Sequence, residues 1–225
     1  MRMIVAVGIP LGLPLMAQER PPQILQIVRE SLKKGGEAAD KAIEKDAARI
    51  CADLKCPNSH LAMESLTGPK EVWWLTPYES ESDRQRVAAG YANNHALMAA
   101  LLEIPKRKQG LVGAPIDILA NYRRDLSEKD SWKVGGTRFF VVTVTKGEAQ
   151  PDAVFEAADG TRFVLRPATT RRQADALVAA AGSRDDRLRH TALLGHAGEG
   201  MDRRRPGVLE AKLNGTIQIE NRWLR

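Results

Sequence analysis

The order of strand and helix patterns constrains the fold of this chain more than any other feature of its sequence. Apolar residues at alternate positions predict strands, and apolar residues three or four positions apart predict helices. Both patterns occur between residues 24 and 122, in the order strand, helix, strand, strand, helix, strand. The predicted elements are Ile24–Leu32, Glu37–Lys55, His60–Leu66, Glu71–Pro77, a helix from Ser80 or Ser82 to about Ile104, and Ile116–Tyr122.

Local signals mark where these elements end. The turn sequence Thr-Gly-Pro-Lys at residues 67–70 predicts a hairpin between the second and third strands. Pro57 is expected to end the first helix and Pro105 the second. A basic cluster follows Pro105, and we expect it to be solvated, because positive charge there complements the helix dipole. Its members are Lys106, Arg107 and Lys108.

The first helix has an apolar stripe that predicts its buried face. The stripe consists of Ala39, Ile43, Ala47, Ile50 and Leu54. Charged residues are expected mostly on the opposite, solvated face, namely Glu37, Asp40, Glu44 and Lys45.

A second strand-rich region follows a polar connector. Three strands are predicted at Thr137–Thr145, Val154–Ala157 and Thr161–Arg166, and the Asp-Gly pair at residues 159–160 is a hairpin signal. Thr169 or Thr170 is expected to cap a helix that ends at Ala181, with Gly182 as its C-cap. A last strand is due after Asp186. This order repeats the first region without its first helix.

The first region resembles the ferredoxin-like βαββαβ unit. The chain also resembles the dimeric α+β barrel superfamily, which includes the antibiotic-biosynthesis-monooxygenase-like domains. The resemblance rests on Ile24–Leu32, on Glu-Val-Trp-Trp-Leu at Glu71–Leu75, and on the long second helix with Tyr-Ala-Asn-Asn-His at residues 91–95.

This resemblance implies an α+β fold with antiparallel sheets and the helices on one face. Residues 22–124 would form a ferredoxin-like domain, and residues 137–186 a second, degenerate ferredoxin-like half. In that superfamily two sheets pack face to face. The uncovered sheet face would therefore be covered by the second half of the same chain or by a second copy in a homodimer.

The first 17 residues have the pattern of a secretory signal peptide. Arg2 precedes an uncharged, mostly apolar run from Ile4 to Met16, and Ala17 is a small residue at a plausible cleavage point. The run is too short for a permanent membrane span, and we expect none in the mature chain. An apolar first strand is the alternative, but the prolines and glycines of the run fit a strand poorly. We expect an exported protein, periplasmic or extracellular.

The net charge of +6 lies mostly outside the predicted domains. Residues 187–225 carry +4 and Arg2 adds +1, which leaves only +1 for residues 18–186. Nucleic-acid binders concentrate positive charge on the folded surface that contacts phosphate, so we expect no nucleic-acid partner.

Residues 187–225 form an irregular basic tail without periodicity. It is either a disordered tail or a segment translated out of frame, since permitted codons for Leu193–Ala211, shifted by one base, can encode an aromatic, amphipathic peptide.

Cys51 and Cys56 are the only cysteines of the chain. Export would place them in an oxidising compartment, where a disulfide across the end of the first helix is geometrically feasible. Two buried thiols fit the sequence equally well.

Four residues are candidates for a ligand pocket: Trp73, Trp74, Tyr91 and His95. Neighbouring strand residues point to opposite faces, so one tryptophan is expected in the core and the other could line a pocket. His95 is the weak candidate for a catalytic base, although a hydrogen-bonded helix histidine is the commoner case. His60 has no metal-ligand neighbour at useful spacing, and we expect no metal and no cofactor.

The sequence supports two functional hypotheses. The first is an exported α+β barrel-like module that binds a small apolar ligand or a partner. The alternative, implied by the family resemblance, is a cofactor-independent monooxygenase-like enzyme that acts on an apolar aromatic substrate near Trp74, Tyr91 and His95. A closed apolar cavity with His95 pointing into it would favour the enzyme, and a solvent-facing His95 would favour the binding module.

Overall fold

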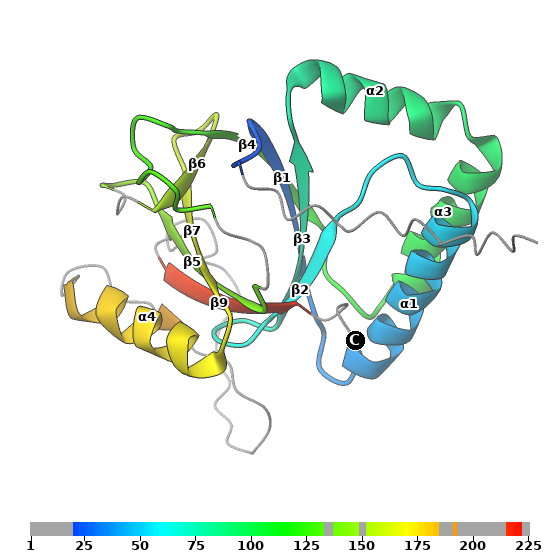
Figure 1. Ribbon diagram of the computed structural model, residues 1–225. Helices are drawn as coiled ribbons and strands as arrows, with labels where there is room; N and C mark the ends of the chain where they lie inside the picture. The colour runs from blue at the N-terminus through cyan, green and yellow to red at the C-terminus, as the bar shows by residue number, and fades with distance from the viewer. Residues whose placement is uncertain (1–19, 133–136, 149–151, 185–190, 193–214, 222–225) are drawn as a thin grey trace, which may run out of the picture.

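The computed structural model describes residues 20–132, 137–148, 152–184, 191–192 and 215–221, and the predicted signal peptide and most of the predicted tail lie outside these ranges. The described residues form an α+β fold with a curled, almost wholly antiparallel sheet (Figure 1). The elements are β1 (Ile24–Ser31), α1 (Glu37–Asp53), β2 (Leu61–Ser65), β3 (Glu71–Tyr78), α2 (Glu81–Ala92), α3 (His95–Lys108), β4 (Ile116–Tyr122), β5 (Phe139–Thr145), β6 (Ala153–Ala157), β7 (Arg162–Ala168), α4 (Arg171–Arg184), β8 (Thr191–Ala192) and β9 (Gly215–Asn221).

The strands follow one another in the sheet as β2-β3-β1-β4-β6-β7-β5-β9-β8. β9 pairs with β5 on one side and also with β2, so the sheet curls back on itself in a barrel-like ring. β1 lies antiparallel to β3, with Ile27 opposite Leu75. The predicted strands Ile24–Leu32 and Glu71–Pro77 are therefore neighbours in one sheet.

The ring consists of two four-stranded groups, β2-β3-β1-β4 and β6-β7-β5-β9. They meet where β4 pairs with β6, with Ala120 opposite Ala157, and where β2 pairs with β9. The two groups share one strand order. In each group the strand that comes first in the sequence, β1 or β5, lies between the third and the last strand of that group. The second group covers the inner face of the first within one chain.

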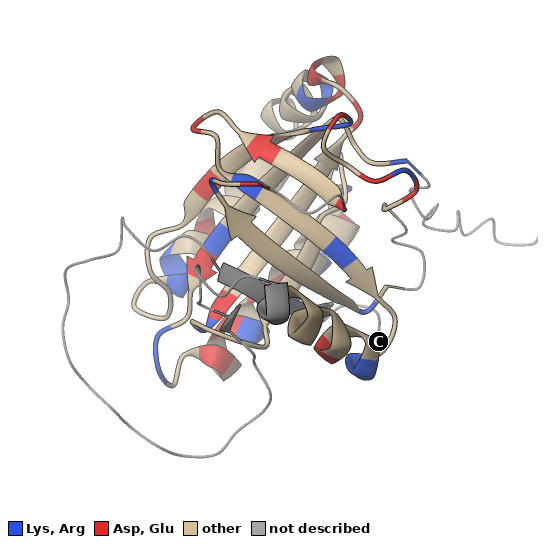
Figure 2. Ribbon diagram, turned by 90° about the vertical axis from the view of Figure 1, so that its left-hand side faces the viewer, with Lys and Arg blue, Asp and Glu red and all other residues tan. Residues whose placement is uncertain are grey.

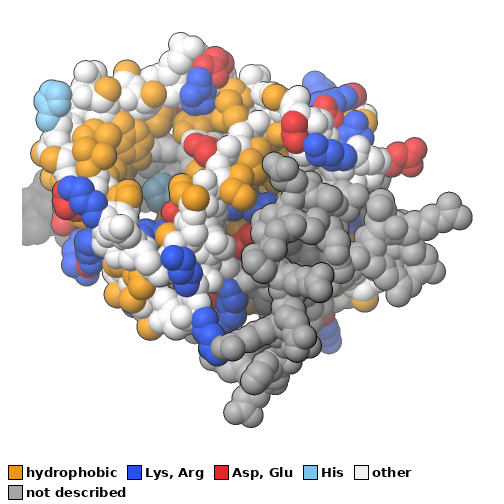
Figure 3. Space-filling view, turned by 180° about the vertical axis from the view of Figure 1, so that it is seen from behind, with side chains coloured by type: hydrophobic (Ala, Val, Ile, Leu, Met, Phe, Trp, Pro, Cys, Tyr) orange, Lys and Arg blue, Asp and Glu red, His pale blue; other side chains and the backbone are white. Residues whose placement is uncertain are grey.

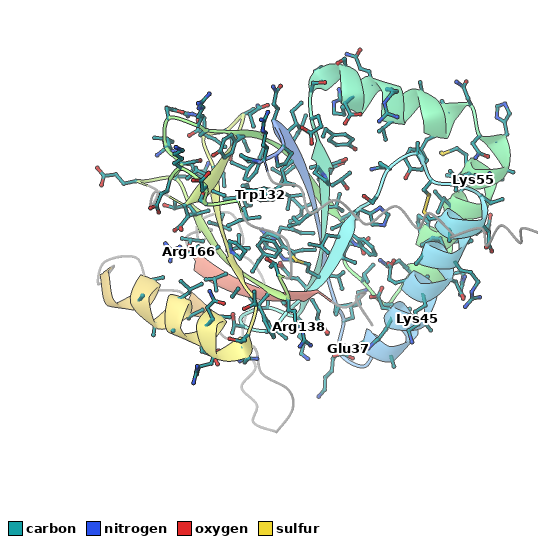
Figure 4. The ribbon with its side chains drawn as sticks, viewed as in Figure 1. Glu37, Lys45, Lys55, Trp132, Arg138 and Arg166 are labelled. Carbon is teal, nitrogen blue, oxygen red and sulfur yellow. A yellow bond between two sulfur atoms is a disulfide. The ribbon has the colours of Figure 1, made fainter. Side chains whose placement is uncertain are left out.

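The main core fills the inside of this ring. Alternate residues of the strands point inward, as the period of two requires, and include Leu25, Ile27, Met63, Trp73, Phe140, Phe155 and Phe163. Trp132, from the connector between β4 and β5, lies among these strands and packs on Phe140 and Phe155 (Figure 4). Burial of these large side chains supplies the dominant driving force for closing the sheet.

The helices lie outside the ring. α1 and α3 run side by side next to the first group of strands, and α4 packs on the second group through Ala174 and Val178 against Val141 and Ala168 (Figure 1). On the side of the molecule shown in Figure 2, acidic and basic residues are intermixed along the strands and loops. The candidate site lies between helices α1 and α3 and strands β1 and β3.

The predicted single second helix is wrong, because it is broken at Asn93 and Asn94. The Asn94 side chain accepts a hydrogen bond from the backbone N–H of Leu97 at 3.1 Å, which caps the new helix α3. Its Nδ2 donates to the carbonyl oxygen of Leu54 at 2.9 Å and ties the break to the end of α1. Ser80 caps α2, accepting from the N–H of Asp83 at 3.1 Å.

Two predicted helix ends are also wrong. α3 continues through Pro105 to Lys108, and α4 continues through Gly182 to Arg184. A proline inside a helix removes one backbone hydrogen bond but does not forbid another turn. In α3 that extra turn carries Lys108, whose ammonium group is held by buried carboxylates described below.

Candidate functional site

A pocket of about 810 Å³ lies between β1, β3 and helices α1 and α3. Its apolar lining comes from Val28, Trp74, Ile104 and Val112, and its polar lining includes Glu30, Glu44, His60 and Lys108. Figure 3 shows the hollow from behind, with hydrophobic side chains around it and a histidine side chain inside.

Strand alternation explains why β1 and β3 can line this pocket. Val28 lies opposite Trp74 in the antiparallel pair, so both side chains leave the sheet on its outer face. Their neighbours Ile27 and Trp73 point the other way, into the core, and both are fully buried. β1 and β3 therefore contribute side chains to the core from one face of the sheet and to the pocket from the other face.

The polar end of the pocket is a buried cluster of charges around Lys108. The Nζ atom of Lys108 lies 2.5 Å from Oε1 of Glu44 and 3.4 Å from Oδ1 of Asp40, and it also pairs with Glu30. The Lys108 side chain is only 5% exposed, and those of Asp40 and Glu44 are 0% and 6% exposed. One ammonium group thus faces three carboxylates away from bulk water.

This cluster corrects two sequence predictions. Asp40 and Glu44 were expected on the solvated face of α1, and Lys108 was expected in a solvated basic cluster, but all three are buried. Lys106 and Arg107 are exposed. Lys108 follows the buried Ile104 by four positions, so it lies on the inward face of α3. The four-residue spacing from Ile104 is the feature of the sequence that indicates burial of Lys108, and Asp40 and Glu44 are separated by the same spacing.

Burial and the neighbouring charges shift the pKa values of Glu44 and Lys108. The pKa of Glu44 is raised to about 7, chiefly by burial, with smaller contributions from the Asp40 and Glu30 carboxylates, while Lys108 opposes the rise. Burial by itself would lower the pKa of Lys108, but Glu44 and Glu30 outweigh it and the pKa is raised. Lys108 is therefore a firmly charged ammonium group, whereas Glu44 exchanges its proton near neutral pH.

An aromatic wall adjoins the charged end. The rings of His60 and Trp74 meet edge to face with their centroids 5.4 Å apart. The Nζ atom of Lys108 lies 5.6 Å from the centroid of the Trp74 ring, which is within cation–π range. His60 keeps solvent-accessible surface, yet the protein atoms around it desolvate the ring and lower its pKa. At neutral pH this imidazole is mostly uncharged.

The structure separates the four residues that the sequence proposed for a pocket. Trp74 lines it. Trp73 lies in the core, where its Nε1 donates to Glu71 at 2.7 Å. Tyr91 lies on α2, where its hydroxyl donates to Asn58 Oδ1 at 2.8 Å, and His95 is exposed at the start of α3. The sequence did not indicate the polar lining residues, which come from β1, α1, α3 and the segment before β2: Glu30, Glu44, Lys108 and His60.

A second buried charge network lies inside the ring of strands. The Arg29 guanidinium group donates to both oxygens of the Glu71 carboxylate, at 2.8 to 3.1 Å, and its Cζ lies 4.5 Å from the centroid of the Trp73 ring. The Glu71 carboxylate therefore accepts hydrogen bonds from both Arg29 and Trp73, and such partners are what a buried ion pair requires. We therefore assign it a structural role.

Cys51 and Cys56 form a disulfide in the structure, drawn as a yellow bond in Figure 4, with their Cα atoms 4.7 Å apart. The bridge links the last turn of α1 to the segment that leads to His60. The disulfide thereby holds the start of the segment that carries His60 against the end of α1.

The carboxylates of Glu30, Asp40 and Glu44 are close enough to ligate one metal ion, since their oxygens lie within 4.8 Å of one another. Lys108 already contacts all three and acts as their cation in this structure. A metal ion would have to displace that ammonium group.

No protein-family model, curated protein or solved structure matches this chain. Among the described residues, every helix is too short or too polar to span a lipid bilayer.

Proposed function

We propose that this protein binds a small ligand in the pocket between its sheet and helices α1 and α3. The observation that carries the proposal is one concave site that combines an aromatic wall with a buried charged end. Small-molecule sites are typically pockets of roughly 300–1,000 Å³ lined by apolar groups with a few converging polar ones. The pocket of about 810 Å³ has this size and this composition.

The monooxygenase-like alternative is less well supported by the geometry. It assigned the catalytic base to His95 and the substrate to a pocket that includes Tyr91. His95 is exposed, and neither residue lines the pocket. A general base must reach the proton that it removes, directly or through one water. The position of His95 therefore favours the binding hypothesis.

Two finer proposals accompany this function. The order β2-β3-β1-β4 supports a ferredoxin-like first unit, and β6-β7-β5-β9 supports a degenerate second unit, as in a dimeric α+β barrel contained in one chain. Export remains a proposal based on the signal-like residues 1–17, and the disulfide is compatible with it. The second unit already covers the inner face of the first, so this fold needs no homodimer for that purpose.

Binding of a neutral apolar dye tests the function. N-phenyl-1-naphthylamine should gain fluorescence on saturable binding to the protein, and Val28→Phe should weaken binding by narrowing the pocket beside Trp74. Leu119→Phe is the matched control, because Leu119 lies on the same outer face of the sheet, next to Gln26 on β1, but does not line the pocket. An affinity that Val28→Phe leaves unchanged would place the ligand elsewhere and refute the proposal.

A further inference from the structure

We infer that the pocket selects an uncharged, largely apolar molecule that carries a hydroxyl group, and that His60 determines this specificity by hydrogen bonding to the hydroxyl. This inference rests on the proposed function, because it names the ligand class of the same pocket. It follows from polar atoms in the pocket wall that have no partners, from the surroundings of those atoms, and from the pairing of the charged groups nearby.

The wall formed by His60 and Trp74 contains polar atoms without hydrogen-bond partners. Both side chains line the pocket, and their rings meet edge to face with the centroids 5.4 Å apart. Within the described ranges, neither the imidazole nitrogens of His60 nor the indole nitrogen of Trp74 takes part in a hydrogen bond. A polar atom that a ligand covers loses its contact with water, which costs free energy unless the ligand supplies a hydrogen bond in return. A ligand that packs on this wall therefore binds best with a polar group of its own.

A hydroxyl group matches an uncharged imidazole in either tautomer. The neutral ring has one nitrogen that donates and one that accepts, and a hydroxyl group does both. A carboxylate only accepts and an ammonium group only donates, so each of them fits one tautomer. His60 is in the uncharged form at neutral pH, because the surrounding protein atoms desolvate its ring and lower its pKa. The indole N–H of Trp74 adds a donor to the same wall.

The surroundings of His60 disfavour an ionised group beside it. The desolvation that keeps the imidazole uncharged would also act on a charged group of the ligand, which would lose its water next to the same ring. Val28, Ile104 and Val112 offer apolar surface to the rest of the ligand but no polar side chain that could offset this loss. An uncharged polar group is therefore favoured at this wall.

The charged side chains that line the pocket are paired with one another or exposed to water. The Nζ atom of Lys108 lies 2.5 Å from Oε1 of Glu44 and also pairs with Glu30, so an ionised ligand would have to compete with these ion pairs. Lys33 and Lys106 are exposed, and an ion pair with an exposed lysine contributes little. A hydroxyl group at His60, in contrast, gains a hydrogen bond without disrupting any pair.

Displacement of N-phenyl-1-naphthylamine from the full chain at pH 7.5 tests the ligand class with four probes of similar shape. These are 2-naphthalenemethanol, which carries the hydroxyl group, 2-methylnaphthalene, which lacks it, 2-naphthoate, which is an anion, and 2-naphthylmethylamine, which is a cation. The alcohol should bind the natural protein more tightly than either ion.

His60→Phe tests the hydrogen bond, because phenylalanine keeps an aromatic ring beside Trp74 but has no nitrogen. The affinity of the alcohol relative to that of 2-methylnaphthalene should fall by about fivefold, the value of one hydrogen bond between uncharged groups. The greater hydrophobicity of 2-methylnaphthalene affects both proteins alike and cancels in this ratio. His95→Phe is the matched control, since His95 is exposed and does not line the pocket, and it should leave the ratio unchanged.

The outcomes separate this inference from the proposed function. Tighter binding of the anion or the cation to the natural protein would overturn the ligand class, and no substitution is needed to observe it. A ratio that His60→Phe leaves unchanged would also overturn the inference. If the dye binds but none of the four probes displaces it, the inference is wrong and the proposed function stands. If the dye does not bind either, both are wrong.

Discussion

The substitution Glu44→Gln should change how the stability of the protein depends on pH. Burial raises the pKa of Glu44 from its ordinary value of 4.5 to about 7, so the folded protein takes up a proton that the unfolded chain does not. This difference corresponds to about 3 kcal/mol, because one pKa unit is about 1.4 kcal/mol. Glu44 is only 6% exposed, so solvent screening reduces this value little.

The sign follows from proton linkage. The contribution of Glu44 to the free energy of unfolding is fully present below pH 4.5 and is lost as the pH rises through about 7. Glutamine has the shape of the protonated acid but does not titrate. The variant should therefore gain stability relative to the natural protein as the pH rises, by about 2.5 kcal/mol between pH 5 and pH 8.

Urea unfolding followed by tryptophan fluorescence at pH 5, 6, 7 and 8 measures this difference. Titrations of groups that do not interact with Glu44 occur in both proteins and cancel when one free energy of unfolding is subtracted from the other. The control Asp53→Asn removes a carboxylate from an exposed position of the same helix and should change the free energy of unfolding at pH 8 by less than about 0.5 kcal/mol. If the curves of Glu44→Gln and the natural protein run parallel over this range, Glu44 has an ordinary pKa and the account of the cluster is wrong.

Three further changes test other parts of the structure by urea unfolding. Lys108→Met should destabilise the protein by about 3–5 kcal/mol at pH 8, because it removes the cation that pairs with the buried Glu44 carboxylate, whereas the exposed Lys106→Met should cost less than about 0.5 kcal/mol. Replacing Cys51 and Cys56 by alanine should cost about 2 kcal/mol from the short loop that they close, and a reducing agent should have the same effect on the natural protein. Arg29→Met should cost about 3–5 kcal/mol, and little loss would show that the buried ion pair is dispensable.

The strands were readable from sequence because their patterns are local. Alternation within Ile24–Leu32 and the turn at residues 67–70 lie within a few residues of what they predict, and β4 was predicted with its observed bounds, Ile116–Tyr122. The adjacency of β1 and β3 followed from the order of elements. The break in the second helix was not predicted, because Asn94 caps α3 and also bonds the distant Leu54.

The charged cluster could not be predicted for a related reason. Lys108 meets Glu44 across 64 positions of sequence and Glu30 across 78, so no local pattern contains the site. Helical periodicity assigns charged residues to the solvated face unless partners for them are known. Trp74 was identified because strand alternation alone sends one of two neighbouring tryptophans to each face.

β1 and β3 separate the hydrophobic core from the pocket. Ile27 and Trp73 support it from the core, and Val28 and Trp74 meet whatever enters the pocket. A change of volume at Ile27 should therefore shift Val28 and alter the affinity for the proposed ligand without contacting that ligand. In a series of substitutions at Ile27, core packing inside the ring and the selectivity of the proposed binding pocket outside it should therefore change together.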